Sequence, residues 1–149
     1  MLHKHRWMLA PLMMAAIALS GCAELPPAAS AKVDPFKVEP ISGTELNRLT
    51  LEAKAVERLG ITTEQVAALP SVGRQGPRTS VPYGAVFYDP KGTTWVYTNS
   101  EPLVFVRHPI TVEHIKGDLA VLREGPPVGT SVVTTGLAEL TGVEFGVGK

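Results

Sequence analysis

Short runs of alternating apolar and polar residues, separated by turn residues, fill the chain from Val81 to Gly136. The clearest of them covers 86–98, where two arms rich in β-branched and aromatic residues flank the tetrapeptide Asp-Pro-Lys-Gly. Residues of these types pack well on a pleated sheet. Asp at the first position and Pro at the second favour a type I turn, because Asp bonds the backbone and Pro presets φ. We therefore predict a β-hairpin over 86–98.

Further strand-like runs follow at intervals of roughly 8–12 residues, with Gly or Pro between them. These runs are 61–66, 103–107, 110–115, 119–123 and 131–136. The segment from Gly73 to Pro77 is polar and is interpreted as a turn or crossover. This spacing predicts a mainly β fold, a small antiparallel β-barrel or β-roll.

One segment has the pattern of a short α-helix. Thr50 suits the N-cap, Glu52 suits the first turn, and Gly60 suits the position after the last turn. The apolar positions that share one helical face are Leu51, Ala55, Val56 and Leu59. We expect about two turns of amphipathic helix, with this face packed on the sheet.

The first 21 residues have the pattern of a signal helix. Basic residues between His3 and Arg6 precede an apolar run over 7–19, which is too short to span a membrane. The run ends in Leu-Ser-Gly-Cys, which resembles the lipobox of bacterial lipoproteins. The resemblance implies cleavage before Cys22 and acylation of its thiol, and several acyl chains hold a protein firmly on a membrane. The alternative is an ordinary signal peptide with an incidental cysteine.

Residues 22–41 are rich in Pro and Ala and show no periodicity. We expect a disordered tether with a reach of up to ~60 Å at ~3.1 Å per residue. An ordering contact around Phe36 or Val38 is left open by the sequence. The expected organisation is a lipoprotein signal peptide over 1–21, a lipidated tether over 22–41, and a β domain over 42–149.

Charge and composition exclude several functional classes. Basic and acidic residues are equal in number, 14 of each, and no basic patch interleaved with aromatic residues occurs, which argues against nucleic acid as a partner. The only cysteine, Cys22, cannot form an internal disulfide. No Gly-x-Ser-x-Gly elbow and no phosphate-binding loop is present, and the glycines over 142–148 open no helix. We therefore expect neither an enzyme nor a cofactor.

Two histidines, His108 and His114, lie close in sequence to Glu113. A zinc site needs three or four converging ligands, and no further Cys is available to supply one. We expect no metal site here. An alternative that the sequence leaves open is an accessory lipoprotein that binds a metal ion or small ligand through these histidines.

Large aromatic residues gather on the central strands. With the alternation of a strand, Trp95 and Tyr97 share one face of the sheet and Val96 takes the other. They are either core residues or part of an exposed ridge that docks another protein. The residues predicted for such docking are Trp95, Tyr97, Phe105 and Arg107.

From Val81 onward the order of several motifs is specific. The motifs are Val-Pro-Tyr-Gly-Ala-Val over 81–86, Asp-Pro-Lys-Gly-Thr-Thr-Trp-Val-Tyr over 89–97, and the segments 105–112, 121–129 and 132–140. Together they resemble the C-terminal, membrane-proximal part of the periplasmic adaptor subunits (membrane fusion proteins) of resistance-nodulation-division (RND) efflux pumps. The earlier segment 49–66 is similar to the adaptor segment that opens the same domain from its N-terminal side.

The chain departs from this family in one respect. A full adaptor inserts a β-barrel, a lipoyl-like domain and a long helical hairpin between the two portions, whereas here only residues 67–78 separate them. The resemblance implies a free-standing, non-catalytic membrane-proximal domain, anchored in a membrane and facing the periplasm or the cell exterior. Its implied partner is the pump protein or a full-length adaptor. A remnant of a longer adaptor is the remaining alternative.

Overall fold

The predicted hairpin is present in the computed structural model, which describes residues 34–70 and 78–146. Strand β6 (Phe87–Tyr88) pairs antiparallel with β7 (Thr94–Glu101), and the backbone N–H of Gly92 donates to the carbonyl of Asp89 over 2.9 Å. Gly92 has a φ of +81°, a left-handed conformation that glycine adopts without strain. The turn residues of the sequence therefore form the turn they predict.

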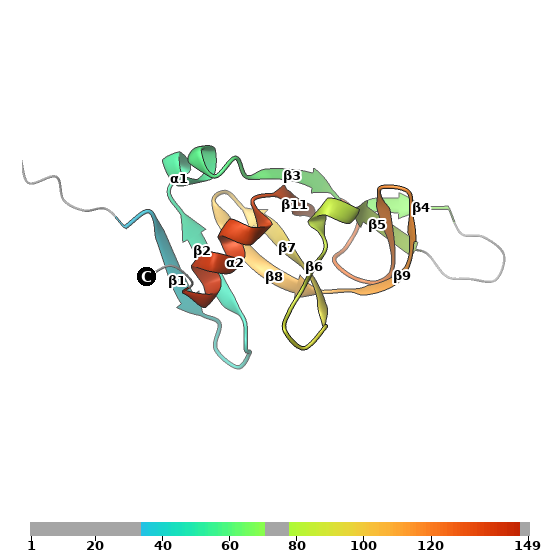
Figure 1. Cartoon of the computed structure of the whole chain (residues 1–149), viewed down its shortest axis with the longest axis horizontal. Coiled ribbons are helices and arrows are strands. Elements are labelled where there is room, and N and C mark those ends of the chain that lie inside the picture. Colours follow the sequence, from blue (N-terminus) through green and yellow to red (C-terminus); the bar gives the residue numbers. More distant parts are fainter. Residues whose placement is uncertain (1–33, 71–77, 147–149) are drawn as a thin grey trace, which may run out of the picture. The chain divides into compact units, whose positions relative to one another are not determined.

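The strands form two antiparallel sheets (Figure 1). The larger sheet has the order β1-β2-β8-β7-β11-β3, with β6 paired to β7. Its strands not yet given are β1 (Phe36–Pro40), β2 (Asn47–Leu51), β3 (Thr62–Gln65), β8 (Val104–Pro109) and β11 (Ser131–Thr135). The smaller sheet has the order β4-β5-β10-β9, with β4 (Ala67–Leu69), β5 (Arg78–Pro82), β9 (Thr111–Lys116) and β10 (Leu119–Glu124).

The mainly β, antiparallel fold is thus confirmed. Each sheet has two end strands, so no closed barrel is found among the residues that the structure describes. The predicted strands over 61–66, 103–107, 110–115, 119–123 and 131–136 correspond to β3, β8, β9, β10 and β11. A single turn of 3₁₀ helix, η1 (Tyr83–Ala85), links β5 to β6.

The predicted short helix is present as α1 (Ala53–Arg58), but its start was misplaced. Thr50 does not cap it, because Thr50 lies in β2 and pairs with Lys37 and Val104 on the two neighbouring strands. Glu52 is the N-cap instead, without a side-chain capping bond. Gly60 follows the helix with a φ of +61°, as expected for that position.

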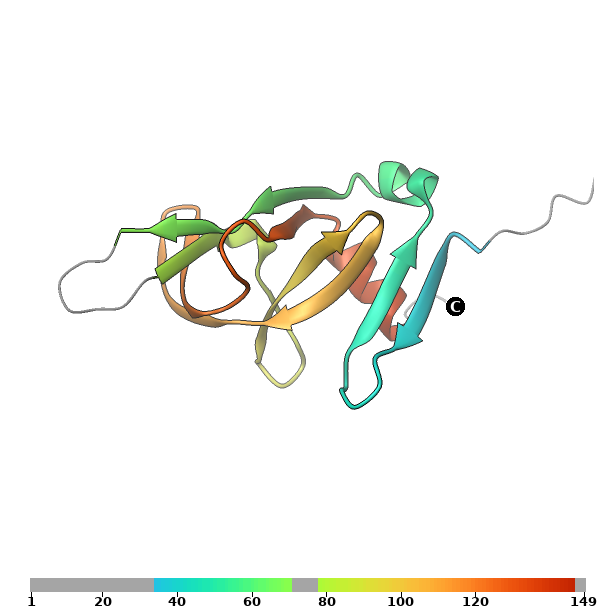
Figure 2. The same ribbon diagram turned by 180° about the vertical axis from the view of Figure 1, so that it is seen from behind.

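A second helix, α2 (Leu137–Phe145), was not anticipated from the sequence. It contacts β1 and β2, and Figures 1 and 2 show it lying across one face of the larger sheet. Its buried residues are Leu140 and Glu144. Helix α2 therefore closes a face of the sheet that the sequence left open to a partner.

Strand β1 lies in the segment expected to be a disordered tether. Phe36 pairs with Leu51 and Val38 with Leu49, which is buried in the core. The alternation of Phe36 and Val38 is enough to hold this segment on the sheet despite its prolines. Strand β1 therefore belongs to the larger sheet, although it lies before residue 42, where the β domain was expected to begin.

Several sequence-based expectations lie outside the described residues. These are the signal peptide over 1–21, the lipidation site Cys22, the first part of the tether, and the turn over 73–77. No helix within 34–70 or 78–146 is both long and apolar enough to cross a membrane.

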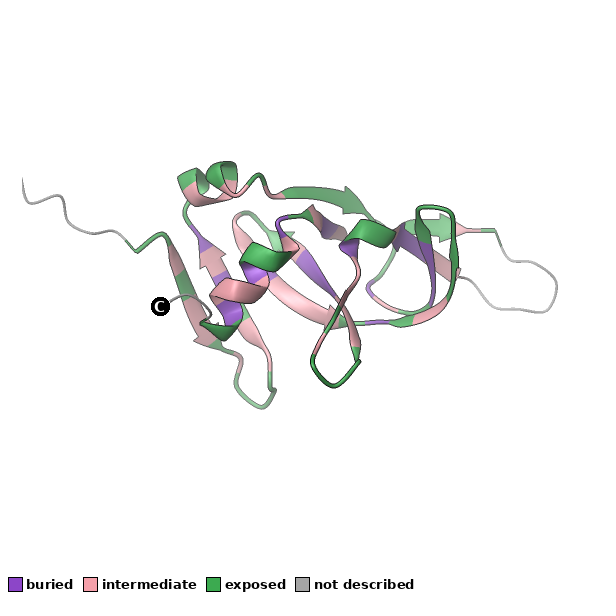
Figure 3. Ribbon diagram, viewed as in Figure 1, coloured by how far each residue is buried: buried purple, intermediate pink, exposed green. Residues whose placement is uncertain are grey.

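Strand β7 is buried along its middle, as the colouring by burial in Figure 3 shows, and it contributes to two hydrophobic cores. Val96 belongs to the core between the sheets, with Val81, Leu122 and Val132. The next residue, Tyr97, belongs to the other core, whose buried members also include Leu49, Leu51, Phe105, Val133 and Leu140. The predicted alternation of Trp95 and Tyr97 against Val96 is thus confirmed.

Candidate docking surface

Arg107 on β8 forms the centre of the candidate site. Its guanidinium carbon lies 4.6 Å from the centroid of the Trp95 ring and 5.4 Å from that of Phe145 on α2. Both distances lie within the range of a cation–π interaction. We call Trp95, Arg107 and Phe145 the aromatic patch; it joins two strands and a helix.

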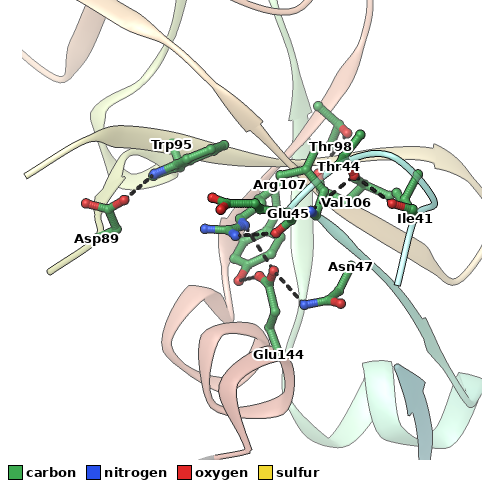
Figure 4. A network of polar contacts seen from close by, with 12 residues as sticks. Ile41, Thr44, Glu45, Asn47, Asp89, Trp95, Thr98, Val106, Arg107 and Glu144 are labelled. Atoms are coloured by element: carbon green, nitrogen blue, oxygen red, sulfur yellow. Dashed lines mark hydrogen bonds and ion pairs between the residues drawn. The ribbon is translucent and has the colours of Figure 1, made fainter. Parts of the chain in front are cut away.

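Trp95 is held by the turn of its own hairpin. Its indole Nε1–H donates to Oδ2 of Asp89 over 3.1 Å, as Figure 4 shows. The other carboxylate oxygen, Oδ1, accepts the backbone N–H groups of Lys91 and Thr93, each at 2.9 Å. Desolvation tends to raise the pKa of Asp89, but the hydrogen bonds outweigh it and the pKa lies below its ordinary value. The charged carboxylate therefore fixes both the turn and the orientation of Trp95.

Arg107 is held from below by Glu144 (Figure 4). Its Nε lies 3.0 Å from Oε1 of Glu144, whose side chain is fully buried. This contact lacks the angle of a hydrogen bond, so it is an attraction between charges. One terminal nitrogen of Arg107 also donates to the carbonyl of Glu45 over 2.8 Å. The guanidinium thus keeps one orientation between the two rings.

Two hydrogen-bond donors also contact the carboxylate of Glu144. The hydroxyl of Tyr97 donates to Oε2 over 2.6 Å, and the side-chain amide of Asn47 donates to Oε1 over 3.4 Å. Burial, followed by the hydrogen bond to Glu144, raises the pKa of Tyr97 above its ordinary value. A buried charge is tolerated when it is paired and hydrogen-bonded, and this network meets both conditions.

Two of the four residues predicted for docking are not available to a partner. Tyr97 and Phe105 are 0% and 2% exposed, because α2 and its neighbours cover them. Tyr97 also stacks on Phe87, with 4.8 Å between the ring centroids. Trp95 is partly exposed and 11% of the Arg107 side chain is exposed, so these two residues remain candidates for docking. The structure adds Phe145, which is 50% exposed and which the sequence did not single out.

The histidines do not come together in one place. His108 lies on the larger sheet opposite Val96, with its Nδ1 2.8 Å from the carbonyl oxygen of Pro109. His114 lies on the smaller sheet opposite Val121. No group of three or more His, Cys, Asp or Glu side chains placed to hold a metal ion occurs within 34–70 and 78–146.

A largely apolar cavity of about 700 Å³ lies beside α1, and no sequence pattern indicated it. Its apolar walls include Phe36, Leu51 and Val143, and the exposed side chains of Lys54 and Arg58 also line it. Cavities of about 300–1,000 Å³ hold small molecules in other proteins. The lining also includes the carboxylate of Glu52, so two basic groups stand against one acidic group, and the cavity suits a small, largely apolar ligand with a negative group.

No protein-family model matches the chain, and no curated protein matches it either.

Proposed function

We propose that this chain is a non-catalytic, lipid-anchored component of an RND-type efflux system. Its β unit is a membrane-proximal-like β-roll that docks on the extracytoplasmic part of the pump or on a full-length adaptor. The lipid on Cys22 keeps the unit at the membrane surface, facing the periplasm or the cell exterior.

The observation that supports this proposal most is the pairing between the two adaptor-like portions of the chain. Strand β3, from the first portion, pairs with β11 from the second, and β2 pairs with β8. In an adaptor the same two portions enter one domain from opposite ends of the chain. The pairing here agrees with that arrangement.

The position of the missing adaptor domains is also consistent with the proposal. They would enter between β4 and β5, and here these strands pair directly, with Ala67 opposite Ser80 and Leu69 opposite Arg78. The sheet is thus continuous at this point without any inserted domain. A free-standing membrane-proximal unit requires such a connection.

The aromatic patch is the surface that we propose for docking. Trp and Arg are the residue types that most often dominate the binding energy of protein interfaces. Their side chains are already fixed by Asp89 and Glu144, so little conformational entropy is lost when a partner binds. Phe145 adds an apolar surface that is half exposed without a partner.

Photo-crosslinking in the native membrane tests this function. The full chain carries a photoreactive phenylalanine derivative at position 145 in one variant and at position 88 in a matched control. Tyr88 is also an exposed aromatic residue, 58% exposed, but lies outside the patch. We expect position 145 to crosslink to an RND pump subunit or an adaptor and position 88 to give none. Crosslinks to neither protein from position 145 would exclude the proposed docking.

The membrane anchor has a separate test. The Cys22→Ser variant lacks the thiol that would be acylated, so we expect the chain to be lost from the membrane fraction. Mass spectrometry of the N-terminal peptide of the unaltered chain should show acylated Cys22. An unmodified thiol there would contradict the anchor and leave the docking proposal to its own experiment.

The cavity beside α1 favours a second candidate function, the binding of a small anionic amphiphile for an exporter. The anionic fluorophore 1-anilinonaphthalene-8-sulfonate is a suitable probe. Ala53 lines the cavity and is exposed, so Ala53→Trp should fill it and abolish saturable binding. The control Ala138→Trp places the same side chain at an exposed site on α2. Equal binding by both variants would exclude this candidate.

A further inference from the structure

Strand β1 is an end strand of the larger sheet (Figures 1 and 2), and within residues 34–70 and 78–146 no strand pairs with its outer edge, which we call the free edge. Glu52 N–H donates to the carbonyl of Pro35, and Ile41 N–H donates to that of Leu46. In an antiparallel pair the backbone groups of alternate residues point to the same side. The backbone N–H and C=O groups of the odd-numbered residues of β1 therefore point toward β2. The N–H and C=O groups of Phe36 and Val38 face outward.

Pro40 is compatible with this alternation of inward and outward backbone groups. It is an even-numbered residue, so the N–H that proline lacks would have pointed outward, where no strand of this sheet needs it. Its carbonyl oxygen still points outward and accepts hydrogen bonds. The free edge of β1 thus offers two N–H donors and three carbonyl acceptors.

We propose that β1 pairs antiparallel with β1 of a second copy of this chain, about a two-fold axis at Val38. In this register Val38 N–H donates to the carbonyl of the partner's Val38, and the reverse bond is equivalent. Phe36 N–H donates to the carbonyl of the partner's Pro40, and by symmetry the N–H of the partner's Phe36 donates to the carbonyl of Pro40. Every outward N–H of the edge is satisfied, and the interface is isologous, as a two-fold axis requires.

The charges of β1 are complementary in the same register. Lys37 lies opposite the partner's Glu39 in a non-hydrogen-bonded pair, the position in which side chains across two strands are closest. Both side chains are open to solvent, 69% exposed for Lys37 and 47% for Glu39. They form an ion pair of 2.8 Å within the strand, and in the dimer two such pairs would meet, each charge opposite one of the other sign across the interface. Two equivalent cross-strand ion pairs follow from the symmetry.

The neighbouring registers are disfavoured by the same residues. A shift of two residues in one direction places Lys37 opposite the partner's Lys37, and the opposite shift places Glu39 opposite the partner's Glu39. Like charges directly opposite each other destabilise a strand pair. A charged edge normally prevents such pairing; here the charge pattern excludes the shifted registers and allows one.

Charge reversal tests this dimer in the full chain, purified in detergent. A single strand pair is a small interface, so we expect a weak dimer whose population rises with concentration in analytical ultracentrifugation. Lys37→Glu turns both ion pairs into repulsions and should weaken dimerisation at least about tenfold, or about 1.4 kcal/mol. The double variant Lys37→Glu with Glu39→Lys restores opposite charges and should restore the dimer.

A matched control is Lys116→Glu, which reverses an exposed lysine on β9, an end strand of the smaller sheet. It should leave dimerisation unchanged, and thermal melting should show that all three variants stay folded. A wild-type chain that is monomeric at every concentration overturns the proposal. So does a dimer that persists in Lys37→Glu, because another surface must then hold it.

Amide hydrogen exchange gives an independent readout of the register. The N–H groups of Lys37 and Glu39 face β2 and should be protected in monomer and dimer alike. Those of Phe36 and Val38 should become protected only as the dimer forms. Exchange at Val38 that stays fast in a sample shown to be dimeric would contradict pairing through β1.

Discussion

The hydroxyl of Tyr97 donates a 2.6 Å hydrogen bond to Oε2 of Glu144, across 47 positions of the chain. The bond joins the central strand β7 to helix α2 within the hydrophobic core that contains Tyr97 and Leu140. Because the carboxylate of Glu144 is fully buried, the free-energy cost of burying its charge is offset only by the donors and the cation that surround it. The attachment of α2, and with it the position of Phe145, depends on this contact.

Removal of that hydroxyl should destabilise the unit. In Tyr97→Phe the ring still packs on Phe87, but Oε2 of Glu144 loses its donor, and a buried hydrogen bond to a charged group is worth about 1.5–3 kcal/mol. Urea unfolding should show a loss of this size. The exposed control Tyr88→Phe should change the free energy of unfolding by less than about 0.5 kcal/mol. Equal effects in both variants would contradict the role of the bond.

Tyr97 should also make the unit sensitive to alkali. Burial and the bond to Glu144 raise the pKa of Tyr97, so the folded state holds its proton while the unfolded chain releases it near pH 10. This contribution to stability is complete below about pH 10 and is lost as the pH rises through the raised pKa. The difference in stability between wild type and Tyr97→Phe should therefore narrow above about pH 10. A constant difference between about pH 8 and pH 11.5 would exclude this linkage.

The pair of Arg107 and Glu144 should show strong coupling. Glu144→Leu leaves the largely buried guanidinium without its counter-charge, and breaking a buried pair from one side costs on the order of 3 kcal/mol. The double variant Arg107→Leu with Glu144→Leu should cost less than the two single changes together. A double-mutant cycle of unfolding free energies measures the difference, expected at about 1–3 kcal/mol. Simple additivity would show that the two charges act independently.

Gly136 should tolerate no side chain. It precedes α2 with a φ of +89°, and a Cβ there would lie 2.7 Å from Cγ1 and 3.4 Å from Cα of Ile61. Gly136→Ala should destabilise by about 1–2 kcal/mol for the backbone conformation alone, and by more for the clash. Gly92→Ala is the matched control, because its φ is +81° but nothing lies within 4 Å. In thermal unfolding, the melting temperature of Gly136→Ala should be clearly lower than that of Gly92→Ala.

The strands over 87–135 could be predicted because local signals agree there. Alternating side chains and the turn residues Asp89 and Gly92 point to the same structure, which the backbone adopts. Strand β1 was missed because proline density was given more weight than the alternation of Phe36 and Val38. Pairing with Leu49 and Leu51 depends on residues elsewhere in the chain, which composition alone does not reveal.

Helix α2 was missed for a different reason. Gly142 lies inside it, Gly136 gives it no side-chain cap, and the charged Glu144 shares the buried face with Leu140. A charge on the apolar face breaks the amphipathic pattern. The signal that was available is the spacing of Leu137, Leu140 and Glu144 at i, i+3 and i+7, between two glycines. Without α2, the cover over Tyr97 and Phe105 could not be foreseen.

Strand β7 has neighbouring residues, Val96 and Tyr97, in opposite cores. A substitution that shifts the backbone at Val96 also displaces Tyr97, because the two residues are adjacent. Loss of packing in one core therefore affects packing in the other. The two cores are therefore coupled through β7, and we expect them to unfold together in one cooperative transition.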